Sequence, residues 1–211
     1  MNKGIESVTE NADASEIETL LERVAHGDRS ALDRLLAAHR TYLRRVIELR
    51  MDNDLRLRVD PSDIIQETSM AVCRRIGEFL VQPPSSFRVW LRSQALERMV
   101  DARRHHFAMK RTVKREDRMA DESSLSIAQR LLAGPSQILR KKEQAEQVRN
   151  IISKMPETDR EILLLRYTEE LTNQQAAEVL GIEPAAARKR LGRAMRRLVE
   201  MLDENDISYH S

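Results

Sequence analysis

The sequence predicts an all-α protein, with two helical domains joined by a flexible linker and a helix-turn-helix as the C-terminal domain. Apolar residues recur three or four positions apart, and no stretch of useful length alternates apolar with polar residues. Aromatic residues make up 3% of the chain and charged residues 33%, a composition that suits helices. Glycine and proline are scarce outside a few positions where helices are expected to meet.

The 211 residues suffice for one or two small domains, and the motifs present argue against several classes of protein. There is no apolar signal core and no apolar run of membrane length, so we expect a cytoplasmic protein with no membrane insertion. The histidines and Cys73 show no metal-ligand spacing, so no metal and no cofactor is expected. Cys73 is expected to be a buried, reduced thiol. A glycine-rich phosphate loop and a nucleophile motif are also lacking, so we do not expect an enzyme.

The N-terminal domain is expected over residues 16–112, after a frayed acidic segment at 1–15. Ser15 is the expected cap of its first helix, which Gly27 and Asp28 end. Ser30 is the expected cap of the second helix. A third helix is expected to begin at residues 60–62, and a fourth spans residues 87–104 after the proline-rich loop at 82–86.

The linker is expected over residues 113–141, with a short helix at 125–132. The C-terminal domain follows over residues 142–204, and residues 205–211 form a tail. Helical periodicity returns at residues 137–155, Pro156 interrupts it, and Thr158 is the expected cap of the next helix.

Residues 172–197 have the pattern of a helix-turn-helix that enters DNA. Gly181 suits the left-handed end of the first helix, and Pro184 suits the first turn of the second. One face of the second helix carries an apolar seam of Ala187, Leu191, Ala194 and Leu198. The other face carries the candidate DNA-binding residues Arg188, Lys189, Arg190, Arg193, Arg196 and Arg197.

The charge of this second helix favours a polyanionic partner. No acid interrupts residues 184–199, so the basic face would repel itself unless phosphates neutralise it. Residues 184–186 are too small to donate to bases, so base reading is expected from Lys189, Arg190 and Arg193. Arg196 and Arg197 are expected on phosphates.

The net charge of +2 conceals a second basic zone in the middle of the chain. Residues 88–118 hold ten basic residues against four acids, whereas the first 22 residues hold six acids against Lys3 alone. Two separate basic zones favour nucleic acid as the partner of both domains.

Three segments resemble the extracytoplasmic-function (ECF) type of bacterial RNA polymerase sigma factor, which has two domains called region 2 and region 4. The segments are residues 60–68, residues 87–111, and residues 155–167 running into the helix-turn-helix. The likeness extends from about residue 17 to about residue 202. It implies a sigma factor that binds core RNA polymerase and directs transcription initiation at a restricted set of promoters.

The resemblance assigns a role to each segment. The first implies binding to the polymerase clamp coiled coil through the polar stripe Asp60, Asp63, Gln66 and Glu67. The second implies −10 reading and capture of single-stranded DNA by Phe87, Arg92, Glu97, Arg98, Arg103, Arg104, Lys110 and Arg111. The loop at 79–87 would receive a flipped base, whereas Trp90 is expected in the core. The third implies −35 reading by the helix-turn-helix and contact with the polymerase flap. An anti-sigma factor is a further candidate partner.

The sequence departs from the family pattern at several positions. Ser69 stands where an aromatic residue is often found, and Glu97 stands where an asparagine commonly helps to hold the flipped nucleotide. The loop at 81–86 lacks the usual short form with glycine. Gly192 costs its helix about 1 kcal/mol relative to alanine, and it allows close approach to the DNA backbone.

Two other classes of function remain open. An autonomous helix-turn-helix regulator would bind palindromic DNA alone as a dimer. A helical adaptor would sequester another regulator and would not read DNA. The regulator leaves the stripe at 60–67 and the basic zone at 88–118 without a role, and the adaptor leaves the basic helix unexplained.

Overall fold

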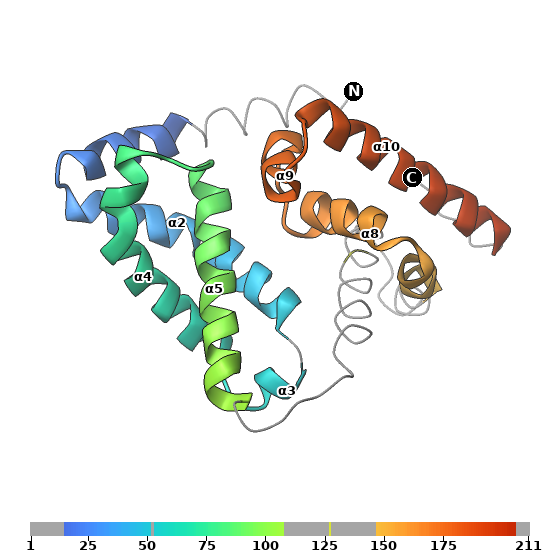
Figure 1. Ribbon diagram of the computed structural model, residues 1–211, viewed down its shortest axis with the longest axis horizontal. Helices are drawn as coiled ribbons and strands as arrows, with labels where there is room; N and C mark the ends of the chain where they lie inside the picture. The colour runs from blue at the N-terminus through green and yellow to red at the C-terminus, as the bar shows by residue number, and fades with distance from the viewer. Residues whose placement is uncertain (1–14, 52, 108–126, 128–146, 206–211) are drawn as a thin grey trace, which may run out of the picture.

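The computed structural model describes residues 15–51, 53–107, 127 and 147–205, and the regular structure in these ranges is helical (Figure 1). A first helix covers residues 15–25 and another covers 147–154. The remaining elements are α2 (Arg29–Arg50), α3 (Asn53–Arg56), α4 (Pro61–Val81), α5 (Phe87–Phe107), α8 (Glu157–Leu163), η1 (Leu164–Thr168), α9 (Asn173–Leu180) and α10 (Pro184–Glu204). The prediction of an all-α protein is therefore confirmed. The expected helix at 125–132 and nearly all of the expected linker lie outside the described residues.

Aspartates cap α2 and α4, two of the long helices of the N-terminal domain. The carboxylate of Asp28 accepts the backbone N–H of Ala31, so the predicted cap at Ser30 is wrong and Ser30 lies inside α2. Asp60 caps α4 in the same way, accepting the N–H of Ser62 at 2.7 Å, and Pro61 occupies the first turn, where a missing N–H costs nothing.

The N-terminal core is packed between α2, α4 and α5. Phe79 and Phe87 meet edge to face at 5.6 Å, and Trp90 lies 4.7 Å from Phe79, which confirms Trp90 as a core residue. Cys73 is exposed, so the expectation of a buried thiol is wrong. It lies one position past the buried Val72, which places it about 100° around the helix from that apolar stripe.

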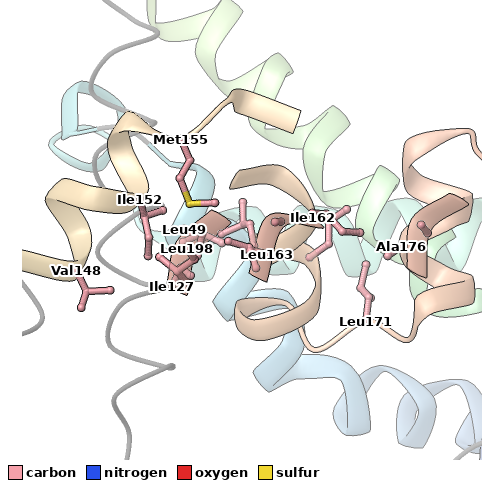
Figure 2. Packing of buried hydrophobic residues seen from close by; sticks show 14 of the residues in the cluster. Leu49, Ile127, Val148, Ile152, Met155, Ile162, Leu163, Leu171, Ala176 and Leu198 are labelled. Atoms are coloured by element: carbon pink, nitrogen blue, oxygen red, sulfur yellow. The ribbon is translucent and has the colours of Figure 1, made fainter. Parts of the chain in front are cut away.

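The C-terminal core joins the helix at 147–154 to α8, η1, α9 and α10 (Figure 2). Its helix α8 begins after Pro156, whose carbonyl accepts the N–H of Asp159, so the predicted cap at Thr158 is wrong. The chain then widens into the π-helix η1, where the N–H of Glu169 bonds the carbonyl of Leu164. Directly after it, Glu170 adopts a left-handed conformation with φ of 54°.

The two cores meet along α2, because that helix has a second apolar stripe. Tyr42, Val46 and Leu49 are buried in the C-terminal cluster, and Figure 2 shows Leu49 close to Leu163 and Leu198. Leu96 of α5 packs against both clusters. The two domains are therefore docked against each other through apolar as well as polar contacts.

Candidate nucleic-acid interface

The helix-turn-helix is built by local interactions that the sequence specifies. At the start of α9, Thr172 and Gln175 form a reciprocal capping box, with side-chain to backbone distances of 3.0 and 3.1 Å. At its end, Gly181 takes the left-handed conformation with φ of 62°. The N–H of Ile182 then bonds the carbonyl of Ala177, which closes the turn before α10.

The two faces of α10 divide as predicted. Ala187, Ala194 and Leu198 are buried against α8 and α9, and Leu191 is partly buried. Arg188, Lys189, Arg193, Arg196 and Arg197 are exposed, and Arg190 is half-buried. A shallow hollow of about 440 Å³ lies on this face, lined by Ala186, Lys189, Gly192, Arg193 and Arg196. The absence of a side chain at Gly192 opens this hollow between basic groups that are suited to a DNA backbone.

Arg197 has a structural partner as well as a predicted role on phosphates. Its guanidinium binds the carboxylate of Asp159, which is buried at the start of α8. This ion pair fixes α10, the recognition helix of the helix-turn-helix, to the rest of its domain. We therefore expect the exposed residues Arg188, Lys189 and Arg193 to be more available for DNA than Arg197.

The polar stripe of α4 faces a groove of the N-terminal domain. Asp63, Gln66 and Glu67 are exposed and line a hollow of about 640 Å³ together with Arg58, Val59, Met70, Asp101, Ala102, His105 and His106. The stripe and the C-terminal end of α5 therefore form one surface. Asp60 differs from the other three, because its carboxylate caps α4, and the hydrogen bonds from Ser62 lower its pKa.

The residues of α5 that are predicted to bind single-stranded DNA differ in exposure, because some of them are buried in the fold. Phe87 and Arg92 are buried, at 4% and 7% exposure, whereas Glu97 and Arg104 are exposed. Arg98 and Arg103 are half-buried, and Lys110 and Arg111 lie outside the described residues. Within the domain, Glu97 binds Arg75 and Arg98 binds Asp101, both at 3.1 Å.

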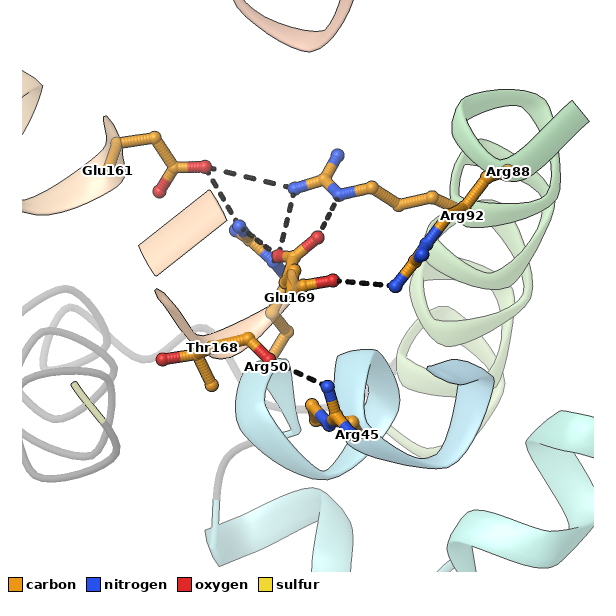
Figure 3. A network of polar contacts seen from close by, with 7 residues as sticks. All are labelled: Arg45, Arg50, Arg88, Arg92, Glu161, Thr168 and Glu169. Atoms are coloured by element: carbon orange, nitrogen blue, oxygen red, sulfur yellow. Dashed lines mark hydrogen bonds and ion pairs between the residues drawn. The ribbon is translucent and has the colours of Figure 1, made fainter. Parts of the chain in front are cut away.

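Arg92 is buried because it contacts the other domain. Figure 3 shows a network in which arginines of α2 and α5 surround the carboxylate of Glu169. Oxygens of Glu169 lie 2.7 Å from Nε of Arg92 and 2.7 Å from a terminal nitrogen of Arg50. Arg88 donates to the backbone carbonyl of Glu169 at 3.1 Å, and its guanidinium lies 4.2 Å from the ring centroid of Tyr42. Glu161 adds a second carboxylate, 2.8 Å from Arg50.

Glu169 remains ionised in this buried position. Burial alone would raise its pKa, but the charges of Arg50 and Arg92 and their hydrogen bonds outweigh it and lower the pKa. The same contact raises the pKa of Arg50 against the opposing effect of its burial. Sequence reasoning missed Glu169. The signal available was an acidic pair, Glu169 and Glu170, directly before the apolar Leu171.

The described residues also bear on the class of site. They contain no group of three or more His, Cys, Asp or Glu residues arranged to hold a metal ion. None of the described helices is both long enough and apolar enough to cross a membrane.

Comparison with known proteins agrees with this architecture. Residues 145–198 match the family model of sigma-70, region 4. A probable RNA polymerase sigma factor, RfaY of Xanthomonas campestris pv. campestris, is 35% identical over 138 residues, which are 63% of this chain and 31% of that protein. The chain thus spans about a third of the length of RfaY.

Two relatives match over more of their own length. RNA polymerase sigma factor CnrH of Cupriavidus metallidurans is 26% identical over 68% of this chain and 74% of its own. RNA polymerase sigma factor NccH of Alcaligenes xylosoxydans xylosoxydans is 24% identical over 92% of this chain and 99% of its own. A solved structure of CnrH in complex with the cytosolic domain of CnrY shares the fold, with a TM-score of 0.52 and 22% identity over 90% of this chain and 98% of that chain.

The helix-turn-helix and its basic face lie within or directly beside the segment that matches sigma-70, region 4. The matched relatives are RNA polymerase sigma factors, so the comparisons confirm the resemblance to the extracytoplasmic-function type that the sequence indicated.

Proposed function

We propose that this protein binds core RNA polymerase and directs it to a restricted set of promoters, acting in the cytoplasm and without catalytic chemistry of its own. The observation that carries the proposal is the face of α10, where Arg188, Lys189 and Arg193 stand exposed on a helix-turn-helix that matches sigma-70 region 4. A helix face that carries only positive charges is suited to duplex DNA, because arginine and lysine side chains bind guanine edges and phosphates.

The two domains divide the task. The C-terminal domain reads the −35 element as duplex through α10. In the N-terminal domain, Asp63, Gln66 and Glu67 offer an acidic surface to the clamp coiled coil of the polymerase. The arginines of α5 hold the −10 strand after it separates. An anti-sigma factor is a further candidate partner, since the CnrH structure contains the cytosolic domain of CnrY.

Run-off transcription on a pool of genomic promoter fragments tests the proposal. Purified core polymerase is used with and without this protein, and discrete transcripts that need the protein are expected. A matched control uses the protein with Arg188, Lys189 and Arg193 all replaced by alanine, which should abolish those transcripts.

An electrophoretic shift on the same pool of promoter fragments separates the other two classes of function. A sigma factor gives a promoter-specific shift with core polymerase present. A specific shift by the protein alone, without any transcript, would instead identify an autonomous regulator. The absence of both transcripts and any shift would identify an adaptor.

A further inference from the structure

Carboxylates of the C-terminal domain occupy two positions on the N-terminal domain that suit an anion. The first is the guanidinium pair of Arg50 and Arg92, which holds Glu169. The second is Ser86, whose backbone N–H and hydroxyl both donate to the carboxylate of Glu178 at 3.0 Å. The carbonyl of Ser86 accepts the N–H of Trp90, so Glu178 lies at the N-terminus of α5, where the helix dipole favours negative charge.

The surface of the N-terminal domain that receives these carboxylates is positively charged. Arg45 and Arg50 come from the end of α2, and Arg88 and Arg92 come from the start of α5 (Figure 3). Their ion-pair partners in the structure, Glu161, Glu169 and Glu170, all belong to the C-terminal domain. The planar fork of a guanidinium group matches both carboxylates and phosphates, so a place that holds a carboxylate also suits a phosphate.

We infer that the docked C-terminal domain mimics a DNA strand, with Glu169 and Glu178 standing where phosphates bind the N-terminal domain. This inference rests on the proposed function, because it concerns regulation of the same −10 site. The protein then cannot be docked and bound to a DNA strand at the same time. When the two domains separate, the arginines exchange their carboxylate partners for phosphates. The basic face of α10 stays uncovered, since Arg188, Lys189 and Arg193 are exposed in the docked protein.

The backbone around Glu169 is consistent with a contact that must be released. The π-helix η1 ends at Thr168, and Glu170 has the left-handed φ of 54° that residues other than glycine rarely adopt. Such a conformation persists where its surroundings hold it. Here the carboxylate of Glu170 binds Arg45 of the other domain at 2.6 Å, so docking helps to hold the conformation.

The first test measures the distance between the domains of the full chain alone. Cys73 is the chain's one cysteine and is exposed, so it takes one dye, and Glu200→Cys on the exposed side of α10 takes the other. Glu169→Gln and Glu169→Lys should shift the distance distribution to longer values. Glu48→Gln is the matched control, because its exposed pair with Arg44 lies within α2, and it should leave the distribution unchanged.

The second test measures binding of a fluorescent 30-nucleotide single strand of random sequence, because phosphate contacts carry no sequence information. Glu169→Gln should bind it about 10-fold more tightly than the parent chain. The slope of log affinity against log salt should steepen by about 0.7 for each phosphate gained. Helical circular dichroism and the emission of Trp90 verify that the variant is folded.

A reversible lock keeps the inference testable if substitutions at Glu169 unfold the domain. Ser86→Cys and Glu178→Cys, in a chain with Cys73→Ser, are joined by a short bismaleimide that contains a cleavable disulfide. The locked protein should lose strand binding and regain it after reduction. An unchanged interdomain distance in folded Glu169 variants would overturn the inference, and so would strand binding by the locked protein equal to that of the reduced protein. Neither measurement uses polymerase, so both are independent of the run-off result.

Discussion

The carboxylate of Glu169 lies 2.7 Å from Nε of Arg92, although the two residues belong to different domains and are 77 positions apart in the chain. Both side chains are almost fully buried, and Arg50 approaches the same carboxylate from α2. A buried acid between two guanidiniums makes the docked arrangement sensitive to the charge of that single residue.

The stabilising contribution of Glu169 should depend on pH in the acid range. Its pKa in the folded protein is below the ordinary value of 4.5, so the contribution is fully present above about pH 4.5 and is lost as pH falls through the folded pKa. At pH 7, Glu169→Gln should destabilise the docked protein by about 3–5 kcal/mol. The measurement is urea unfolding of both proteins between pH 7 and pH 3. If the difference in free energy of unfolding between the two proteins stayed constant with pH, it would contradict the role given to this carboxylate.

The capping box of α9 should make a measurable contribution to stability. Thr172→Ala removes the side-chain oxygen that accepts the N–H of Gln175 and should cost about 1 kcal/mol. Thr158→Ala is the matched control, because Thr158 is exposed and Pro156 holds the cap position of α8. Thermal unfolding should therefore separate the two threonines, and equal shifts in Tm would show that the capping box contributes nothing.

The acidic stripe on α4 should be required for polymerase binding. Asp63→Arg reverses the charge at an exposed position in the groove, so we expect it to abolish co-purification with core polymerase while helical content is unchanged. Asp33→Arg makes the same change at an exposed position on α2 and should co-purify normally. Normal co-purification of the Asp63 variant would remove the stripe from the polymerase surface.

Arg193 should read a base rather than hold a phosphate. It is exposed beside Gly192 in the hollow of α10, so Arg193→Ala should cost about 1–3 kcal/mol in promoter binding and relax the preference at one −35 position. Binding by the holoenzyme to promoters substituted at each −35 position provides the measurement. Lys154→Ala, exposed outside α10, is the control. An equal loss of affinity on every sequence would assign Arg193 to a phosphate.

The helix-turn-helix could be predicted from sequence because its determinants are local. Gly181, the apolar seam from Ala187 to Leu198 and the basic face lie within one short segment, and periodicity indicates which side of each helix is buried. Two cap predictions failed for an equally local reason. Asp28 and Pro156 each precede the predicted cap by two residues and take the cap position first.

The docking of the domains could not be predicted in the same way. Arg50 and Glu169 are 119 positions apart, and a charged residue on a helix gives no sign of a distant partner. On α2, the stripe of Tyr42, Val46 and Leu49 adjoins the apolar face formed by Leu43 and Ile47. Sequence alone therefore indicates one broad apolar face, whereas the structure divides it between two cores.

The π-helix at Leu164–Thr168 accommodates one extra residue of the chain at this point. A π-turn contains one residue more than the α-helical turn it replaces, so deleting one residue here would restore ordinary α-helical bonding. In ordinary α-helical geometry the extra residue would instead rotate everything downstream by about 100° relative to α8. The π-turn absorbs that residue, and Leu163 and Leu171 on its two sides are buried in the same core. The wider turn therefore accommodates one more residue between these leucines without redirecting the helix-turn-helix that follows.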